Sequence, residues 1–288
     1  MIGKIYKILA NFYYVKVDNT VYECKAKGNF KNTKTDLAVG DNVEIEIDKF
    51  NDEKGNIIKR LDRKNYILRP SVANIDKLII VISIKKPLPD MVLLDKQIIY
   101  ALLNNIEPVI CINKIDLDLK SEYLKIKETY EKIGYKVYSI STKEKTGLTE
   151  IKKEIQNSMC VLSGNSGVGK SSFVNAIFET DIMKEGKISE KISRGKHTTR
   201  HIEIFDYENC QIVDTPGFSV FDVLDIKKEE LYKYYEEFNE YIDECEYRDC
   251  GHIKENRCGI KEAVNENKID NDRYERYKLI YQELGGKK

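Results

Sequence analysis

Residues 164–172 have the types and the spacing that bind a triphosphate. They fit the pattern G-x-x-x-x-G-K-[ST], in which glycines let backbone N–H groups approach phosphate oxygens closely. Lys170 would place its charge beside the β- and γ-phosphates, and the Ser171 hydroxyl would ligate Mg²⁺. A chance glycine-rich turn is the weaker interpretation, because a strand-like run precedes the loop and a helix-like run follows it. The predicted phosphate-binding residues are Gly164, Asn165, Ser166, Gly167, Val168, Gly169, Lys170, Ser171 and Ser172.

A second motif, earlier in the chain, has the residue types that select a purine base. It follows an apolar run, residues 108–112, that predicts a buried strand. The carboxylate of Asp116 can accept hydrogen bonds from N1–H and the 2-amino group of guanine. Adenine offers neither donor and would leave this carboxylate unpaired, so the motif favours GTP over ATP. The predicted base-binding residues are Asn113, Lys114, Ile115 and Asp116.

Neighbouring residues could support base binding. The Lys114 stem can pack over the base, and Asn113 can tie neighbouring loops together. Ser141 and Thr142 follow another strand-like run, residues 136–140, and backbone N–H groups there could cap the guanine O6. Because ligands of such sheets bind outside the carboxyl ends of the strands, we expect all these loops to share one cleft.

Residues after the phosphate loop could respond to the γ-phosphate. Asp214 ends an apolar run and could hold Mg²⁺ through a water, while the Gly217 N–H could meet the γ-phosphate. In the polar stretch 188–201, Thr198 or Thr199 could close on Mg²⁺ and the γ-phosphate. We prefer Thr199, although the spacing does not decide. The predicted Mg²⁺ ligands are Ser171 and Thr199.

The residue that would orient an attacking water is less clearly marked. Phe218 follows the Asp-Thr-Pro-Gly motif and cannot polarise water, which predicts slow intrinsic hydrolysis. His197 is the internal candidate for this role, and an exposed loop histidine or one that contacts a partner is an equal alternative. The predicted catalytic residues are His197, Lys170, Thr199 and Gly217.

A separate cluster near the C-terminus has the ligands of a metal site. Cys245, Cys250, His252 and Cys258 supply three thiolates and one imidazole within a short stretch. Three cysteines and one histidine form a closed tetrahedral Zn²⁺ site of the structural type. A chance cluster or a redox pair is the weaker alternative. We expect one structural zinc, which would supply much of the folding energy of the residues around it.

The bulk composition suits a soluble globular protein. The net charge is zero, so no global field draws the chain to nucleic acid or to a membrane. No apolar run approaches the roughly 20 residues that span a bilayer, and the first residues lack a secretory signal. We therefore expect a cytoplasmic protein without a membrane partner. In that compartment the seven cysteines argue against a disulfide framework and leave metal binding open.

The order of strand and helix signals predicts a multidomain α/β protein. Residues 1–66 contain short strands typical of an OB-type β-barrel, with lysines and aromatic residues that could bind RNA or only solvate a loop. Residues 67–223 alternate strands and helices, which predicts a doubly wound sheet. Residues 224–288 are expected to form charged helices, over 228–241 and 270–284, around the zinc site.

The motifs resemble the GTPase superfamily in a circularly permuted order, with the base-reading loops before the phosphate loop. A barrel, a permuted GTPase domain and a Cys-Cys-His-Cys cluster, in this order, resemble the RsgA family (also called YjeQ or YloQ) over essentially the whole chain. The resemblance implies a Mg²⁺-dependent GTP hydrolase that assists late maturation of the 30S ribosomal subunit. It further implies that the barrel and zinc domains contact 16S rRNA and that the subunit stimulates hydrolysis. We expect a monomer that binds GTP and GDP.

The main alternative is a GTP-regulated RNA-binding scaffold whose hydrolysis is incidental. A GTPase assay with and without 30S subunits would distinguish the two interpretations, because stimulated hydrolysis favours the enzyme and no stimulation favours the scaffold. An ATPase of similar fold is a third interpretation, which Asp116 disfavours.

Overall fold

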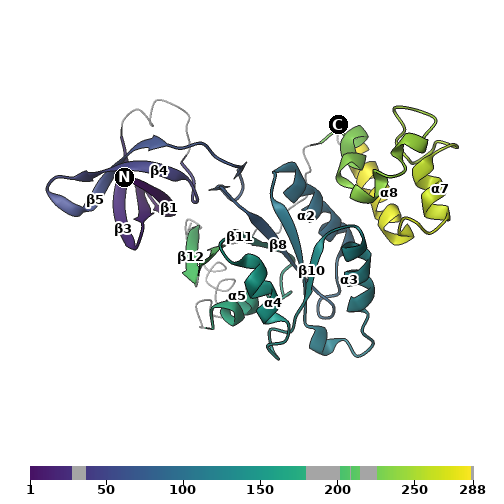
Figure 1. Cartoon of the computed structure of the whole chain (residues 1–288), viewed down its shortest axis with the longest axis horizontal. Helices are drawn as coiled ribbons and strands as arrows, with labels where there is room; N and C mark the ends of the chain where they lie inside the picture. The colour runs from purple at the N-terminus through teal and green to yellow at the C-terminus, as the bar shows by residue number, and fades with distance from the viewer. Residues whose placement is uncertain (28–36, 180–201, 208, 215–225, 287–288) are drawn as a thin grey trace.

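The computed structural model describes the chain except for residues 28–36, 180–201, 208, 215–225 and 287–288. Three parts follow one another across the molecule (Figure 1): an N-terminal barrel, a central α/β part and a C-terminal helical part. Among the described residues, none of the helices has the length and apolar character needed to cross a bilayer.

The N-terminal part is a small β-barrel, as the sequence predicts. β1 pairs with β2 and also with β4, which closes the barrel, and β3 pairs in parallel with β5. Alternate side chains point inward, so Ile5, Val15 and Ile57 lie fully buried in its core. The strands are β1 (Ile2–Leu9), β2 (Phe12–Val17), β3 (Thr20–Ala26), β4 (Asn42–Asp48) and β5 (Asn51–Arg60).

Two tight reversals shape the barrel strands. The chain turns between β1 and β2 where Ala10 adopts a left-handed backbone (φ 50°). It turns again between β4 and β5, where Asp48 accepts a hydrogen bond from the Phe50 N–H.

The central part is a doubly wound sheet, and its strand order is β10-β9-β8-β11-β13-β12. Neighbours pair in parallel except β12, which runs antiparallel to β13. These strands are β8 (Lys77–Ser83), β9 (Glu107–Asn113), β10 (Lys136–Ser139), β11 (Met159–Ser163), β12 (Glu203–Tyr207) and β13 (Cys210–Asp214).

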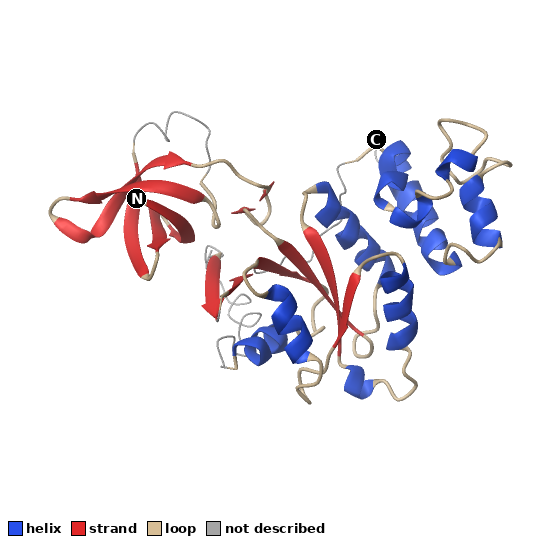
Figure 2. Cartoon of the chain, viewed as in Figure 1, coloured by secondary structure: helices blue, strands red, loops and turns tan. Residues whose placement is uncertain are grey.

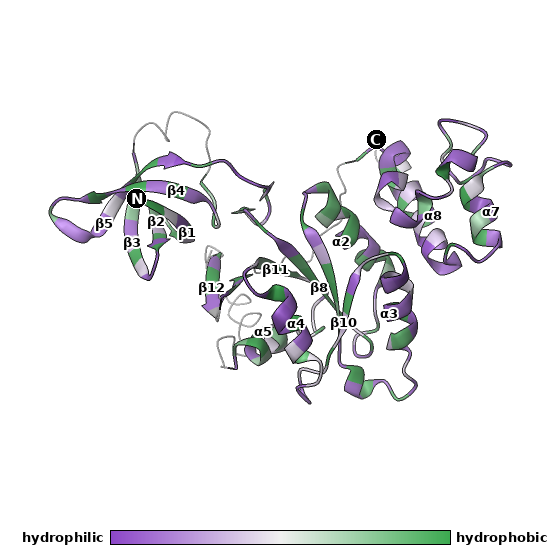
Figure 3. Ribbon diagram, in the orientation of Figure 1, coloured by the Kyte–Doolittle hydropathy of each residue, from purple (hydrophilic) through white to green (hydrophobic). Residues whose placement is uncertain are grey.

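Helices cover both faces of this sheet (Figure 2). Successive side chains of β8 alternate between the two cores: Leu78 and Ile80 pack with α2, whereas Ile79 and Val81 pack with α4 and α5. This is why β8 is apolar from Leu78 to Ile82, and Figure 3 shows the centre of the sheet as hydrophobic. The helices are α2 (Met91–Leu103) and α3 (Tyr123–Lys132) on one face, and α4 (Leu148–Ile155) and α5 (Lys170–Phe178) on the other.

A short connector joins the barrel to the sheet. It contains β6 (Tyr66–Ile67) and β7 (Val72–Ala73), which pair with each other. The Ala73 N–H donates to Val39 O at 2.9 Å, and Asn74 Nδ2 donates to Gly40 O at 2.9 Å. β1 also pairs with β12 at Lys7 and Glu203, so the barrel touches the central sheet at a second place.

The C-terminal part is helical, with one correction to the sequence prediction. The stretch 228–241 is a series of 3-10 turns rather than one helix: Lys228–Tyr234, then Glu236–Phe238. Tyr235 between them is extended, and its ring packs against Phe238 and Tyr277 at 5.1 and 5.0 Å between centroids. Tertiary packing therefore overrides the helical pattern. The remaining elements are Ile242–Glu244, α7 (Gly259–Asn265) and α8 (Asn271–Gly285).

Candidate nucleotide and metal sites

The predicted phosphate loop connects β11 to α5, the setting that its motif requires. Gly164 has φ +136°, and a Cβ there would lie 2.1 Å from Val81 O. Gly169 has φ +99° and caps α5, and a Cβ there would lie 2.4 Å from Asn113 Nδ2. Both glycines are therefore needed for the loop to pack, and the N-terminus of α5 points its free N–H groups into the loop.

Lys170 lies at the first turn of α5 and folds back over the loop. Its Nζ donates to Gly164 O at 2.6 Å and to Asn165 O at 2.9 Å. Burial lowers the pKa of this ammonium. A phosphate beside it would favour the charged form again, so the side chain is placed to meet an anion.

Asn113, at the carboxyl end of β9, joins three loops. Its Nδ2 donates to Val168 O of the phosphate loop at 3.0 Å. Its Oδ1 accepts from the Lys114 N–H at 2.8 Å and from the Thr142 N–H at 3.2 Å. The side chain is fully buried, so these bonds replace all contact with water. The predicted tying role of Asn113 thus has a direct geometric basis.

Lys114 reinforces the same junction. Its backbone is left-handed (φ 64°), and its Nζ donates to Gly167 O at 2.7 Å and to Lys86 O. The stem therefore runs from the base-reading motif across to the phosphate loop. A purine lying against this stem would have its phosphates at the loop.

The sequence did not reveal the role of the Ser141 side chain. Its backbone was expected to contact the base, but its hydroxyl also donates to Asp116 Oδ1 at 2.7 Å. The same Oγ accepts from the Glu144 N–H at 3.1 Å, which fixes the direction of the hydroxyl. Ser141 thereby orients the carboxylate predicted to read guanine. The only sequence signal is a serine directly after a strand, which is too common to assign a role.

The remaining predicted residues are placed only in part. Asp214 ends β13, which pairs with β11, so its backbone lies at the same end of the sheet as the phosphate loop. His197, Thr199, Gly217 and Phe218 fall outside the described residues, and their predicted roles stay predictions.

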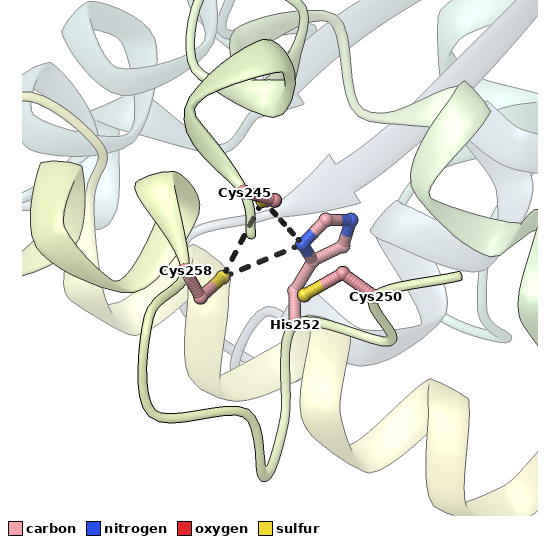
Figure 4. A group of neighbouring side chains, drawn as sticks. All are labelled: Cys245, Cys250, His252 and Cys258. Atoms are coloured by element: carbon pink, nitrogen blue, oxygen red, sulfur yellow. Dashed lines mark hydrogen bonds between the residues drawn. The ribbon is translucent and has the colours of Figure 1, made fainter. Parts of the chain in front are cut away.

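The metal-ligand cluster comes together as the sequence predicts. The ligand atoms of Cys245, Cys250, His252 and Cys258 all lie within 4.8 Å of one another (Figure 4). His252 Nδ1 is 3.6 Å from Cys245 Sγ and 3.5 Å from Cys258 Sγ, and the two sulfurs are 3.9 Å apart. Tetrahedral Zn²⁺ with usual bond lengths requires about 3.8 Å between two sulfurs and about 3.6 Å between sulfur and nitrogen. The residues therefore fit this ion.

The chemistry of these ligands also suits a dication. Burial raises the pKa of Cys250 to about 12 and lowers the pKa of His252. The imidazole is thus neutral, as a ligand must be, and a bound dication would hold the thiols as thiolates. Tyr274 and Tyr277 of α8 fix the loop by donating to His252 O at 2.7 Å and Gly251 O at 3.0 Å.

Comparison with known proteins agrees with this geometry. The profile described as the RsgA GTPase matches residues 60–224, and the RsgA N-terminal domain matches residues 2–57. The chain belongs to the RsgA GTPase family. Two relatives named small ribosomal subunit biogenesis GTPase RsgA are 41 % and 43 % identical to it. The first, from Caldanaerobacter subterraneus subsp. tengcongensis, aligns over 98 % of this chain and 95 % of its own length. The second, from Clostridium novyi, aligns over 99 % and 97 %.

Two solved structures share the fold over the length of this chain. YjeQ from Thermotoga maritima superposes with a TM-score of 0.85 at 32 % identity, covering 100 % of this chain and 99 % of that one. YloQ, described as a circularly permuted GTPase, gives a TM-score of 0.83 at 32 % identity, covering 100 % and 96 %. This RsgA family member accordingly has a circularly permuted GTPase fold, in which the base-reading motif precedes the phosphate loop.

Proposed function

We propose that this chain binds GTP in the cleft between the phosphate loop and the base-reading loops and hydrolyses it with Mg²⁺. The observation that carries the proposal is the buried side chain of Asn113, which bonds to both loops at once. A base held by one loop would therefore have its phosphates at the other. Membership of the RsgA GTPase family supports the same reaction.

The individual roles follow from the chemistry of each residue. Asp116, oriented by Ser141, would accept the two guanine donors, and Lys170 would neutralise the phosphates. Ser171 and Thr199 would hold Mg²⁺, with Asp214 acting through a water, and the ion supplies charge stabilisation of the phosphoryl group. The Gly217 N–H would meet the γ-phosphate, and His197 would orient the water.

The Asp116→Asn variant tests the base-reading role. The new amide would turn a donor toward the 2-amino group of guanine, so GTP affinity should fall at least about a hundredfold. Xanthosine triphosphate, which carries a carbonyl acceptor in place of that amino group, should gain affinity. Isothermal titration with both nucleotides measures this. Glu144→Gln, which changes an exposed carboxylate on the adjoining loop, is the matched control and should bind GTP like the wild type. Unchanged GTP affinity in Asp116→Asn would rule out the role.

We propose that the enzyme acts on the small ribosomal subunit in the cytosol. The relatives named small ribosomal subunit biogenesis GTPase, aligned over nearly the whole chain, support this assignment. The finer proposals are contacts with 16S rRNA, stimulation of hydrolysis by the subunit, and a monomer with domains 1–66, 67–223 and 224–288. Titrating purified 30S subunits into a GTPase assay tests them. Hydrolysis that does not respond to the subunit would instead favour a GTP-regulated scaffold.

We further propose that Cys245, Cys250, His252 and Cys258 hold one structural Zn²⁺. The interatomic distances between the sulfurs and His252 Nδ1 support this ion. Metal analysis of the purified full-length protein should find one equivalent of zinc, and a protein without zinc that keeps its C-terminal helices would exclude the assignment.

A further inference from the structure

The second half of the phosphate loop is anchored from outside the loop. Asn113 Nδ2 donates to Val168 O at 3.0 Å. Lys114 Nζ donates to Gly167 O at 2.7 Å. Both side chains come from the carboxyl end of β9 and the residue after it, and Asn113 is fully buried. This half of the loop therefore has support that does not depend on its own side chains.

The first half of the loop is held from within. The carbonyl oxygens of Gly164 and Asn165 accept from Lys170 Nζ at 2.6 and 2.9 Å. Lys170 is also the residue predicted to neutralise the phosphates, so a bound nucleotide would share its three donors with both carbonyls. A further donor on this half would keep its backbone fixed while the ammonium contacts the phosphates.

A buried amide of α2 faces this first half. The side chain of Gln97 is 1 % exposed, and together with Gly164 and Asn165 it lines a cavity between α2 and the phosphate loop. Its Nε2 has no hydrogen-bond partner among the described residues. Leaving a buried amide donor unpaired is costly, so such a group ordinarily bonds to protein or to an ordered water.

The cavity suits a single water. Its volume is about 10 Å³, which is room for one molecule. Ser83, at the carboxyl end of β8, also lines it, and its Oγ donates to Pro87 O at 2.7 Å while keeping lone pairs that can accept. A water here can accept from Gln97 Nε2 and donate to Ser83 Oγ and to a carbonyl of the loop. Three such bonds are typical of a buried water.

We propose that Gln97 is a positioning residue of the nucleotide site, and that it holds the first half of the phosphate loop through one buried water. This role rests on the proposed function, because it concerns the loop that would bind the phosphates. Gln97 acts on the loop backbone, so that its N–H groups are already in place when the nucleotide arrives and less free energy is lost in ordering them. GDP and GTP use the same loop, so both should depend on Gln97.

Gln97→Leu tests this role in the full chain. The new side chain has nearly the same volume but lacks the donor that would hold the water. GDP and a non-hydrolysable GTP analogue with Mg²⁺ should each bind about tenfold more weakly than to the wild type, as measured by isothermal titration. The urea midpoint of the nucleotide-free chain should stay close to the wild-type value, because an apolar group replaces an amide that has no direct protein partner. A purely structural role would instead lower stability and affinity together.

Two further variants sharpen the test. Gln97→Asn keeps the amide and leaves space for a second water, so it should recover most of the lost affinity. Tyr135→Phe is the matched control, because it removes another buried polar group without a partner among the described residues. Tyr135 lies just before β10, at the end of the sheet opposite the phosphate loop, so this variant should bind both nucleotides like the wild type.

The water itself can be detected by nuclear Overhauser contacts to the Gln97 side-chain amide, assigned by their loss in Gln97→Leu. Absence of these contacts in the wild type, or wild-type affinity in Gln97→Leu, would overturn the role of Gln97. So would losses of affinity and stability that run in parallel across the Gln97 variants. Each of these results leaves the proposed GTPase function intact when the wild type binds GTP in the same titrations. A wild type that does not bind GTP would overturn the proposed function and this role with it.

Discussion

The two ends of the central part are joined to their neighbours by very different chemistry. At the C-terminal junction, Asp95 of α2 accepts from Arg273 Nη1 at 2.5 Å and from Arg276 Nε at 2.6 Å. Asp95 and Arg273 are 1 % and 2 % exposed. At the barrel junction with β12, the side chains of the ion pairs are 27–37 % exposed. The first junction is therefore shielded from water, and the second is in partial contact with it.

The buried junction is completed by further partners of Arg273. Glu237 of the C-terminal part accepts from its Nε, and Tyr130 of α3 donates to Asp95 at 2.5 Å. Ile99 of α2 packs in the same apolar cluster as the C-terminal helices. Three rings surround the guanidinium at 4.7 to 5.9 Å from their centroids: Tyr130, Tyr135 and Tyr235.

The difference indicates which junction is costlier to rearrange. Separating a buried ion pair leaves an ion without water or counter-ion, so the C-terminal part should move with α2 and α3 as one body. The partly exposed ion pairs between the barrel and β12 can be exchanged for water at lower cost.

Loss of a zinc ligand should cause the largest loss of stability, and this loss should be confined to the C-terminal part. Cys258→Ser removes a ligand at the start of α7, and structural zinc contributes on the order of 10 kcal/mol to folding of its surroundings. We expect zinc content to fall to zero and the C-terminal helices to unfold, as measured by metal analysis and limited proteolysis. Cys24→Ser is the control, because Cys24 lies in the barrel core, far from the predicted ligands in sequence, and this variant should keep the zinc of the C-terminal part. A zinc-replete Cys258→Ser protein would contradict the assignment.

Asp95→Ala should be the next most damaging change. It leaves Arg273 buried without its carboxylate, and breaking a buried pair in this way costs about 3–5 kcal/mol. Urea unfolding monitored by tyrosine fluorescence and circular dichroism would measure the loss.

Asp272→Ala is a matched control for Asp95→Ala, because Asp272 joins the same two parts through Lys125. Their side chains are 63 % and 74 % exposed, so the change should cost less than about 1 kcal/mol. Equal losses in the two variants would show that burial does not distinguish these contacts.

The smallest effect is expected at the barrel junction. Asp206→Asn removes the charge that Lys16 and Tyr6 contact on the surface, and it should cost less than about 1 kcal/mol at low salt. Because salt screens exposed charges, the difference from wild type should vanish near about 1 M NaCl. Unfolding curves at low and high salt measure the difference in the free energy of unfolding between Asp206→Asn and the wild type. A large loss of stability that persists at high salt would show that the barrel junction behaves like the buried C-terminal junction.

The sequence by itself determined the local chemistry. The glycines at 164 and 169, the strand ending at Asn113 and the spacing of Cys245, Cys250, His252 and Cys258 are local patterns, and each constrains the backbone within a few residues. The barrel, the doubly wound sheet and α8 follow from periodicity for the same reason. Residue types and their spacing along the chain were enough to predict these features.

Tertiary structure decided what distant residues do to one another. The Asp95–Arg273 pair joins residues 178 positions apart, and Tyr6 reaches Asp206 across 200 positions. The hydrogen bond from the Ser141 hydroxyl to Asp116 exists only because two strands lie side by side in the folded chain. Tyr235 adopts an extended backbone instead of a helical one, and its ring packs against Tyr277. Such contacts have no signature in the sequence, because their free energy arises from burial that exists only after the chain has packed.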